Sequence, residues 1–497
     1  MDVTKCNIPA SWPPEAREFA REAISEIHEL RTAVKKMIAD IAGLQMNLEK
    51  SQKEILELKA KLKTDSSNSH LPPSKDPPGK PDRETKPSGR KQGAQKGHPG
   101  SGRSLFPSER VNHIQDVFPD RCSVSGKTLC PEDMASLSFR PFHQVDVPEE
   151  MELVITEFRL HTCHCPCGCG NDITAQMPKA AGNSVVGIRL KSFMGLLSSR
   201  YHLSKALIRE LLIDLFGPDA AFSTGCISEA EKELSSSLEA PYQEAREAIK
   251  NAEAVNVDET SWFLKHNLHW LWTAVSDALT VFYIDPNRSQ AAFDRFLGNF
   301  EGLIMSDRYS AYAKLSPAER QLCWAHLTRD FRKLVDRQGG AEKLGSWALK
   351  EIETIFGLWR WYMEGQITIE ELRKEFVSIR ARFGRLLALG KETADPKAQK
   401  FCRNLSKLWP SLWTFLKRPD ILQPTNNRAE QAIRPAVIGR GLSLGSQSER
   451  GLRFTERILT TVATLRKQGR ALLAFIQEAL LAYRTGRAPP SLLPAPT

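Results

Sequence analysis

AEAVNVDETSWF, residues 252–263, opens the part of the chain that decides its fold. LHWLWTAVSD (268–277) and ALTVFYIDP (278–286) follow, and all three stretches are rich in Val, Trp, Phe and Tyr, which favour strands. A predicted helix, SQAAFDRFLGNF (289–300), and a further strand, GLIMSD (302–307), come next. Three strands in a meander, then a helix and a strand, predict a mixed sheet covered by helices.

Helices are predicted after this region. Residues 340–420 are expected to be almost wholly helical, and FTERILTTVATLRKQGRALLAFIQEALLAYRTG (454–486) forms another long helical region. The last residues, APPSLLPAPT (488–497), are expected to fray because they are rich in proline.

Residues 185–250, before the predicted sheet, are also expected to be helical. LSKALIRELLIDLFG (203–217), the turn-rich PDAAFSTG (218–225) and CISEAEKELSSSL (226–238) follow the outline of a helix-turn-helix, which reads DNA with its second helix. The alternative is an ordinary pair of packed helices.

A seven-residue repeat runs through residues 16–63. Its seam consists of Ile27, Leu30, Val34, Met37, Ile41, Leu44, Leu48, Ser51, Ile55, Leu58 and Leu62. A seam of this spacing is buried only against another helix, so it predicts a coiled coil through which the protein associates with itself. The alternative is one long helix packed on its own protein.

Residues 64–104 are dense in Pro, Gly, Ser and Lys and have too little apolar surface for a core, which predicts a disordered linker. Its basic residues suit either a tether along a phosphate backbone or a solvated spacer. The net charge of +10 fits a polyanionic partner. No apolar run predicts a membrane span or a signal peptide, and the sparse cysteines are typical of a reducing compartment.

Residues 105–180 are predicted to form a small Cys/His module with strand-like stretches such as MELVITEFRLHT (151–162). The run HTCHCPCGCGND places several potential ligands close together, and Zn²⁺ commonly takes four Cys or His ligands. The candidate ligands are Cys122, Cys163, Cys165 and Cys167, with Cys130 as a further thiol. Ser125 stands where a second Cys would complete a C-x-x-C pair, so the alternative is a site that binds zinc weakly or has lost it.

Two acids end predicted strands, Asp258 in VNVDET and Asp307 in GLIMSD. A buried carboxylate is costly unless it is paired or binds a metal, and two that converge call for a divalent cation. Glu430, in PTNNRAEQAIRP, is expected in the first turns of a helix capped by Asn426 or Asn427. Three such carboxylates suit two-metal phosphoryl transfer, although each taken singly is more often a surface or capping carboxylate.

Cationic side chains accompany these acids. Arg428, Arg434 and Arg440 flank or follow Glu430, as a phosphate-binding site requires. In QLCWAHLTRDFRKL (321–334), a predicted helix, His326 and Arg329 share a polar face and are candidates for phosphate contact. The alternative for His326 is a structural role.

With these residues in view, the chain resembles the transposases of the insertion sequence 66 family. The resemblance is carried by VDET (257–260), SDRYSAY (306–312), CWAHLTRDF (323–331) and NNRAEQAIRP (426–435), in the family's order. SSNSHLPPSKD (66–76) and GAQKGHPG (93–100) are similar to the family's linker elements.

The resemblance implies a multidomain α+β protein of bacterial cytoplasm, associated with the nucleoid. Its ribonuclease-H-like core, residues 252–480, would carry a helical insertion at about 335–420. The triad would fall on Asp258, Asp307 and Glu430, with Mg²⁺ or Mn²⁺ as cofactor. The partners implied are the element's DNA ends and target, a second copy of the chain, and small accessory proteins of the element. The competing functions are a metal-dependent nuclease of the same fold and a non-catalytic DNA-binding protein.

Overall fold

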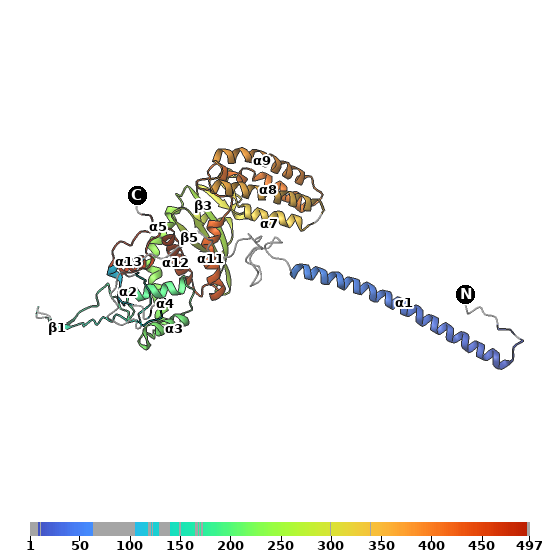
Figure 1. The fold of residues 1–497 in the computed structure, drawn as a ribbon, viewed down its shortest axis with the longest axis horizontal. Coiled ribbons are helices and arrows are strands. Elements are labelled where there is room, and N and C mark those ends of the chain that lie inside the picture. The colour runs from blue at the N-terminus through green and yellow to red at the C-terminus, as the bar shows by residue number, and fades with distance from the viewer. Residues whose placement is uncertain are drawn as a thin grey trace.

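The structure is a computed structural model, and it describes residues 8–9, 11–62, 105–117, 121, 123–128, 140–148, 151–164, 167, 169, 172–298, 300–337 and 339–494. In residues 52–62 and at residue 164 it describes the backbone only. Figure 1 shows a central sheet with a group of helices at either end and one long N-terminal helix that extends away from them.

The centre is a five-stranded sheet in the order β5-β4-β3-β6-β7. Its strands are β3 (Ala254–Leu264), β4 (Asn267–Val275), β5 (Thr280–Asp285), β6 (Leu303–Ser306) and β7 (Arg320–Leu322). The first three form an antiparallel meander, whereas β6 and β7 run parallel to β3. The predicted mixed sheet, with its helix α6 (Gln290–Leu297) before β6, is therefore confirmed.

Alternating side chains give the sheet two buried faces. Val255, Val257 and Trp272 pack on one face against α5 (Glu239–Ile249), α6 and α13 (Leu472–Thr485). Trp262 and Leu271 pack on the other against α11 (Asn427–Ser443) and α12 (Glu449–Lys467). Helices on both faces exclude water from strands with so many β-branched and aromatic residues.

Helix α12 also covers the free edge of β5. Three of its side chains, one per turn, accept hydrogen bonds from β5 backbone amides: Glu456 from Ile284 at 2.6 Å, Thr460 from Phe282 at 3.0 Å and Thr464 from Thr280 at 3.0 Å. An edge strand otherwise leaves such groups unpaired, so α12 closes this side of the sheet.

The insertion between β7 and α11 is helical, as predicted. It contains α7 (Trp324–Val335), α8 (Gly339–Met363), α9 (Ile369–Lys391), α10 (Pro396–Lys407) and the 3₁₀ turns η7 (Pro410–Leu412) and η8 (Thr414–Leu416). These elements build their own core around Trp324, Phe383 and Trp413. The amide of Trp324 donates to the carbonyl of Pro424 at 2.8 Å, so the insertion begins and ends at one point.

At the other end of the sheet lie α2 (Ile188–Ser199), α3 (Lys205–Phe216), the 3₁₀ turn η5 (Pro218–Ala220) and α4 (Thr224–Ser237). The predicted helix, turn and helix are confirmed, with Ser204 and Ser223 capping α3 and α4 through their side chains. Helix α4 carries three glutamates and one lysine. Such a charge does not favour α4 as a helix that enters a DNA groove, and the DNA-reading role stays a prediction.

Helix α1 (Pro14–Leu62) confirms the predicted N-terminal helix. Its described seam residues are all exposed, from 42% at Ile27 to 68% at Leu44, so they have no partner within the described chain. The self-association predicted from this seam stays a prediction. The linker predicted at 64–104 lies outside the described residues.

The Cys/His module contains the 3₁₀ turn η3 (Ser108–Arg110) and a two-stranded antiparallel sheet, β1 (Thr162–His164) with β2 (Asp172–Thr174). The strand predicted over residues 151–162 is wrong except at its last residue. Leu153 packs against the core of the neighbouring helices, but most of the other apolar side chains of this stretch are exposed, and Val154 is 97% exposed.

The C-terminal region is divided into α12 and α13 at Gly469, whose φ of 66° ends the first helix. The expectation that residues 488–497 fray is wrong for the described part of that segment. Leu492 is fully buried in the main core, and the side chain of Gln468 donates to its carbonyl oxygen at 2.9 Å. No helix in the described part of the chain is long and apolar enough to cross a membrane.

Candidate active site

Asp258 and Asp307 lie side by side on neighbouring parallel strands. The register of β3 and β6 pairs Asn256 with Met305, and two residues further along each strand come Asp258 and Asp307. Asp307 directly follows the last residue of β6, as predicted, but Asp258 lies in the middle of β3. The strand continues because β4 pairs with it as far as Leu264, well beyond the end of β6.

Glu430 reaches the same edge of the sheet from the first turn of α11. The N-cap residue of this helix is Asn426, as predicted, but its side chain makes no capping hydrogen bond. Instead its Nδ2 donates to the carbonyl oxygen of Val257 at 2.8 Å, and its Oδ1 accepts from Nδ2 of Asn256 at 3.0 Å. This buried amide fastens the start of α11 to β3 directly beside Asp258.

The electrostatics of Asp258 show that the three carboxylates, called here the carboxylate cluster, are close to one another. Burial raises the pKa of Asp258 well above its usual value, and repulsion from Glu259, Asp307 and Glu430 raises it further. Only a backbone hydrogen bond, from the amide of Glu259 at 2.9 Å, opposes this shift. Without a cation the cluster is an unfavourable concentration of negative charge.

Two buried polar atoms at the cluster have no hydrogen-bond partner among the described residues. They are Oε1 of Glu430, which belongs to the cluster, and Nδ1 of the neighbouring His326. They lie 3.6 Å apart. Burial lowers the pKa of His326, and the charge of Arg329 lowers it further, which favours the neutral imidazole. An orphaned carboxylate oxygen and a repelled Asp258 fit the requirements of an oxygen-liganded divalent cation such as Mg²⁺ or Mn²⁺.

Cys323 offers a second possible ligand set, because its sulfur and ligand atoms of His326 and Glu430 all lie within 4.8 Å of one another. Burial raises the pKa of the Cys323 thiol to about 11, and its sulfur accepts a hydrogen bond from the amide of Asn426 at 3.2 Å. Metals bind the thiolate, so a protonated, hydrogen-bonded thiol is a poor ligand. The set of Asp258, Asp307 and Glu430 therefore fits a metal better.

A buried acid that the sequence analysis did not single out lies behind the cluster. Glu259 accepts hydrogen bonds from the hydroxyl of Tyr312 and from Nη2 of Arg288, the latter at 2.6 Å. The guanidinium of Arg288 also lies 3.7 Å from the ring centre of Tyr309. The sequence signal for Glu259 was its position as the second acid of VDET. On the strand it faces the opposite side from Asp258. Its partners come from distant segments that the local pattern does not connect.

Asp307 is held by its own backbone surroundings. Its Oδ1 accepts from the amide of Tyr309 at 2.9 Å, and its carbonyl oxygen accepts from Nη2 of Arg320. Arg320 is almost fully buried and also donates from Nε to the hydroxyl of Ser306 at 2.9 Å. These bonds fix the turn after β6 and hence the position of the carboxylate.

The five candidate phosphate contacts divide into two groups. Arg428 forms an ion pair with Asp277, and Arg440 donates to the hydroxyls of Thr260 and Ser261, so both have partners inside the protein. Arg434, His326 and Arg329 make no side-chain hydrogen bond within the described chain. Arg434 is exposed one turn after Glu430, and Arg329 lies next to His326 on α7. The second group is available to a ligand at the cluster.

The proposed zinc ligands are only partly described. Cys163 and Cys167 are exposed, with Cys163 opposite Ile173 in the β1–β2 pair. Cys122 and Cys165 lie outside the described residues, as does Cys130. The zinc site therefore stays a prediction.

The five-stranded sheet and the carboxylate cluster lie entirely within residues 216–454, the segment that matches the family described as "Transposase IS66 family". This segment, a little under half of the chain, matches the IS66 transposase family. Residues 11–104, before it, match a family of unknown function, DUF6444. The resemblance seen in the sequence motifs is thus confirmed, and all three carboxylates are inside the IS66 segment.

A curated relative also matches part of the chain. The chain is 28% identical over 274 residues to a Sinorhizobium fredii (strain NBRC 101917 / NGR234) protein named "Uncharacterized protein y4qI". The match covers 48% of this chain and 49% of that relative, so the chain spans about half the length of the protein it matches.

Proposed function

We propose that this protein is a DNA transposase that binds the ends of its insertion element and catalyses metal-dependent strand cleavage and strand transfer. One observation carries the proposal. Asp258, Asp307 and Glu430 come from three separate elements and converge at one edge of the sheet, where a buried amide ties the third element to the first. A surface or capping role explains none of this convergence.

The fold supports the same proposal. A three-stranded antiparallel meander followed by two parallel strands, with helices on both faces, suits the ribonuclease-H-like core that the sequence resemblance implies. The segment that contains α7 to α10 would then hold the helical insertion in that core, predicted at about residues 335–420.

The proposed chemistry is phosphoryl transfer. Asp258, Asp307 and Glu430 would hold Mg²⁺ or Mn²⁺, and when bound, such ions activate the attacking oxygen and stabilise the leaving oxygen. His326, Arg329 and Arg434 would orient the phosphate between the carboxylates, because they lie beside the cluster and make no side-chain hydrogen bond within the described chain. Water as the nucleophile gives cleavage, and a DNA 3′-hydroxyl in the same position gives strand transfer.

The partners proposed are DNA, at the element's ends and at the target, and a second copy of this chain. Transposition needs two ends held together, and the exposed seam of α1 suits a coiled coil for that purpose. Small accessory proteins of the element and zinc in the Cys/His module belong to the same proposal.

Two other functions remain as competitors. A nuclease of the same fold would use the same carboxylates without joining strands. A non-catalytic DNA-binding protein would keep the fold without using the cluster. Asp258 is buried and is repelled by the neighbouring carboxylates, which is unfavourable for its charged form. A metal-binding role explains why the protein keeps this arrangement, whereas a non-catalytic DNA-binding role does not.

The deciding experiment uses labelled DNA that carries the element's ends, with Mg²⁺ or Mn²⁺, and compares the wild-type protein with Asp258→Ala. Metal-dependent joined products that disappear in the variant are the expected result. End-specific cleavage without joining would indicate the nuclease. Specific binding without cleavage under any metal would indicate the non-catalytic protein, and the catalytic assignment would then be wrong.

A further inference from the structure

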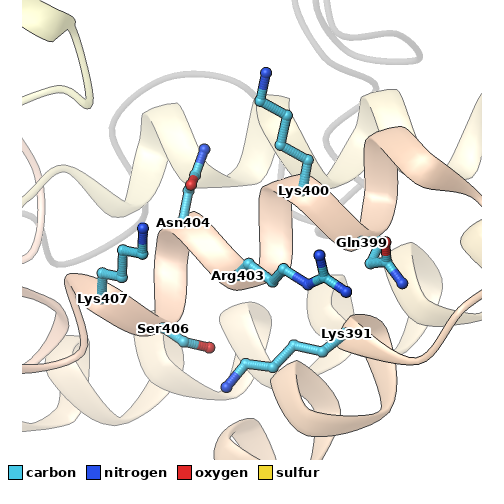
Figure 2. A pocket seen from close by; sticks show the side chains of 7 residues that line it. All are labelled: Lys391, Gln399, Lys400, Arg403, Asn404, Ser406 and Lys407. Atoms are coloured by element: carbon cyan, nitrogen blue, oxygen red, sulfur yellow. The ribbon is translucent and has the colours of Figure 1, made fainter.

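Helix α10 presents a row of cations to solvent. Its twelve residues include Lys397, Lys400, Arg403 and Lys407 and no acid. The spacing of three or four residues places them along one side of the helix, opposite the buried Ala398, Cys402 and Leu405. Figure 2 shows Lys400, Arg403 and Lys407 on this helix, with Lys391 from the end of α9 beside them.

These side chains line a shallow hollow of about 610 Å³. Its lining consists of Lys391, Gln399, Lys400, Arg403, Asn404, Ser406 and Lys407. Every one of these residues carries a hydrogen-bond donor, and none carries a carboxylate. The hydroxyl of Ser406 donates to the carbonyl oxygen of Cys402. The donors left for phosphate oxygens are the ammonium, guanidinium and amide groups, which commonly contact a nucleic-acid backbone.

Some other cations of the insertion differ from these because they have acidic partners. Arg337 pairs with Asp395 at 2.6 Å, and Arg382 pairs with Glu351 at 2.8 Å. The four cations of the hollow, called here the α10 basic surface, make no side-chain hydrogen bond or ion pair with any described residue. They are Lys391, Lys400, Arg403 and Lys407. An unbalanced row of this kind attracts a polyanion.

The α10 basic surface is connected to the carboxylate cluster through one aromatic side chain. Phe401, next to Lys400, packs with its ring centre 4.8 Å from Cζ of Arg308, the residue after Asp307. The same ring lies 5.1 Å from that of Phe331, on the helix that carries His326. These two contacts place α10 against the segments that carry Asp307 and His326.

We propose that the α10 basic surface binds the phosphate backbone of DNA held at the carboxylate cluster, without reading its sequence. This rests on the proposed function and extends it to a second DNA contact. Twelve helical residues span about 18 Å, which corresponds to about five base pairs of duplex. The flexible ammonium groups suit phosphate contact, and sequence reading would require side chains that enter a groove.

The test measures binding of the full-length protein to a labelled duplex of arbitrary sequence, without divalent metal, over a range of salt concentrations. The variant changes the four cations of the surface together: Lys391→Gln, Lys400→Gln, Arg403→Gln and Lys407→Gln. The matched control removes three lysines and one arginine that are exposed elsewhere on the insertion: Lys350→Gln, Arg360→Gln, Lys374→Gln and Lys417→Gln. Both variants are checked for an unchanged thermal unfolding midpoint.

The α10 variant is expected to bind at least about 10-fold more weakly at moderate salt, and the slope of log K against log salt is expected to fall by about 3. The control should keep most of the wild-type slope. A variant with Arg in place of the three lysines should bind like the wild type, because it keeps the charge. This pattern would support the surface as a backbone contact.

Other outcomes would overturn the proposal. Equal losses in both variants would indicate only a general effect of net charge, and an unchanged slope in the α10 variant would show that the surface does not touch DNA. Loss of inorganic phosphate binding alone, with DNA binding intact, would indicate a small-anion site. If the wild type binds no DNA at all, the proposed function itself fails, which this series distinguishes from failure of the surface alone.

Discussion

The side-chain amide of Asn426 donates to the backbone carbonyl of Val257 at 2.8 Å, one residue before Asp258. The same amide accepts from Asn256, so a single buried side chain connects the strand of the first carboxylate with the helix of the third. The relative position of Asp258 and Glu430 depends on these two hydrogen bonds.

Asn426→Ala should therefore weaken metal binding. The variant leaves Asn256 and the Val257 carbonyl without partners, which should reduce the free energy of unfolding by about 1–3 kcal/mol. Loss of the support should reduce Mn²⁺ affinity, measured by calorimetric titration, by about 10- to 100-fold. Asn427→Ala, at the exposed neighbouring position, is the control and should change neither quantity. A stable Asn426→Ala protein with wild-type Mn²⁺ affinity would contradict this role.

Arg434 and Arg428 should differ in their effect on DNA. Arg434 is exposed one turn after Glu430 without an internal partner, whereas Arg428 is paired with Asp277. Arg434→Gln should weaken binding of cleavable end DNA by about 1.5–3 kcal/mol, the range for a hydrogen bond to a charged group. Arg428→Gln should weaken it much less. Equal effects of the two changes, measured by anisotropy at one salt concentration, would show that Arg434 has no special contact.

Glu456 should make the stability depend on pH. Burial raises its pKa to about 7 in the folded protein, although Arg453 pairs with it. The unfolded chain releases this proton at its ordinary pKa, so between about pH 4.5 and 7 the folded state binds it more tightly. The contribution of Glu456 to the free energy of unfolding should therefore fall by about 3 kcal/mol as the pH rises through that window.

The measurement is the unfolding midpoint of the wild type relative to Glu456→Gln, which has no proton to release. The midpoint of the wild type minus that of the variant should decrease from pH 5 to pH 8. Glu449→Gln, at an exposed position of the same helix, should show a difference that stays constant with pH. A constant difference for Glu456→Gln as well would mean that its carboxyl does not titrate in this range.

The seam of α1 should control the association state. Val34→Asp with Ile41→Asp places two charges on the predicted coiled-coil seam, where they would be buried against a second copy. Light scattering should show a smaller mass than for the wild type. Thr32→Asp with Ala39→Asp adds the same charge on the opposite side of the helix and should leave the mass unchanged. A wild type that is already monomeric at all concentrations would disprove self-association through α1.

The sequence predicted the sheet because its strands are rich in Val, Trp, Phe and Tyr, and it predicted that Asp258 and Asp307 converge because both were expected at strand ends. It did not predict that β3 continues past Asp258, since that extension depends on pairing with β4. Patterns within one segment report which residues are apolar, whereas strand ends depend on the partner strand.

Contacts between distant segments account for most of what the sequence analysis missed. Arg440 was interpreted as a phosphate ligand, but its donors bond to Thr260 and Ser261, about 180 residues earlier in the chain. Leu492 lies in a proline-rich stretch that suggests fraying, yet its side chain packs in a core that other segments of the chain form. The residues around Arg440 and Leu492 in the sequence predict neither contact, because the partner residues are remote in sequence.

The hydrogen bond from Trp324 to Pro424 has a consequence for how this protein can diverge. Because the two ends of the insertion meet, the helices between them join the sheet at one point, as a short loop would. Junctions of this kind tolerate insertions and changes of length well. Helices α8, α9 and α10 can gain or lose turns over evolutionary time without displacing Asp307 or Glu430. Relatives are therefore expected to preserve the carboxylates while their insertions vary in length.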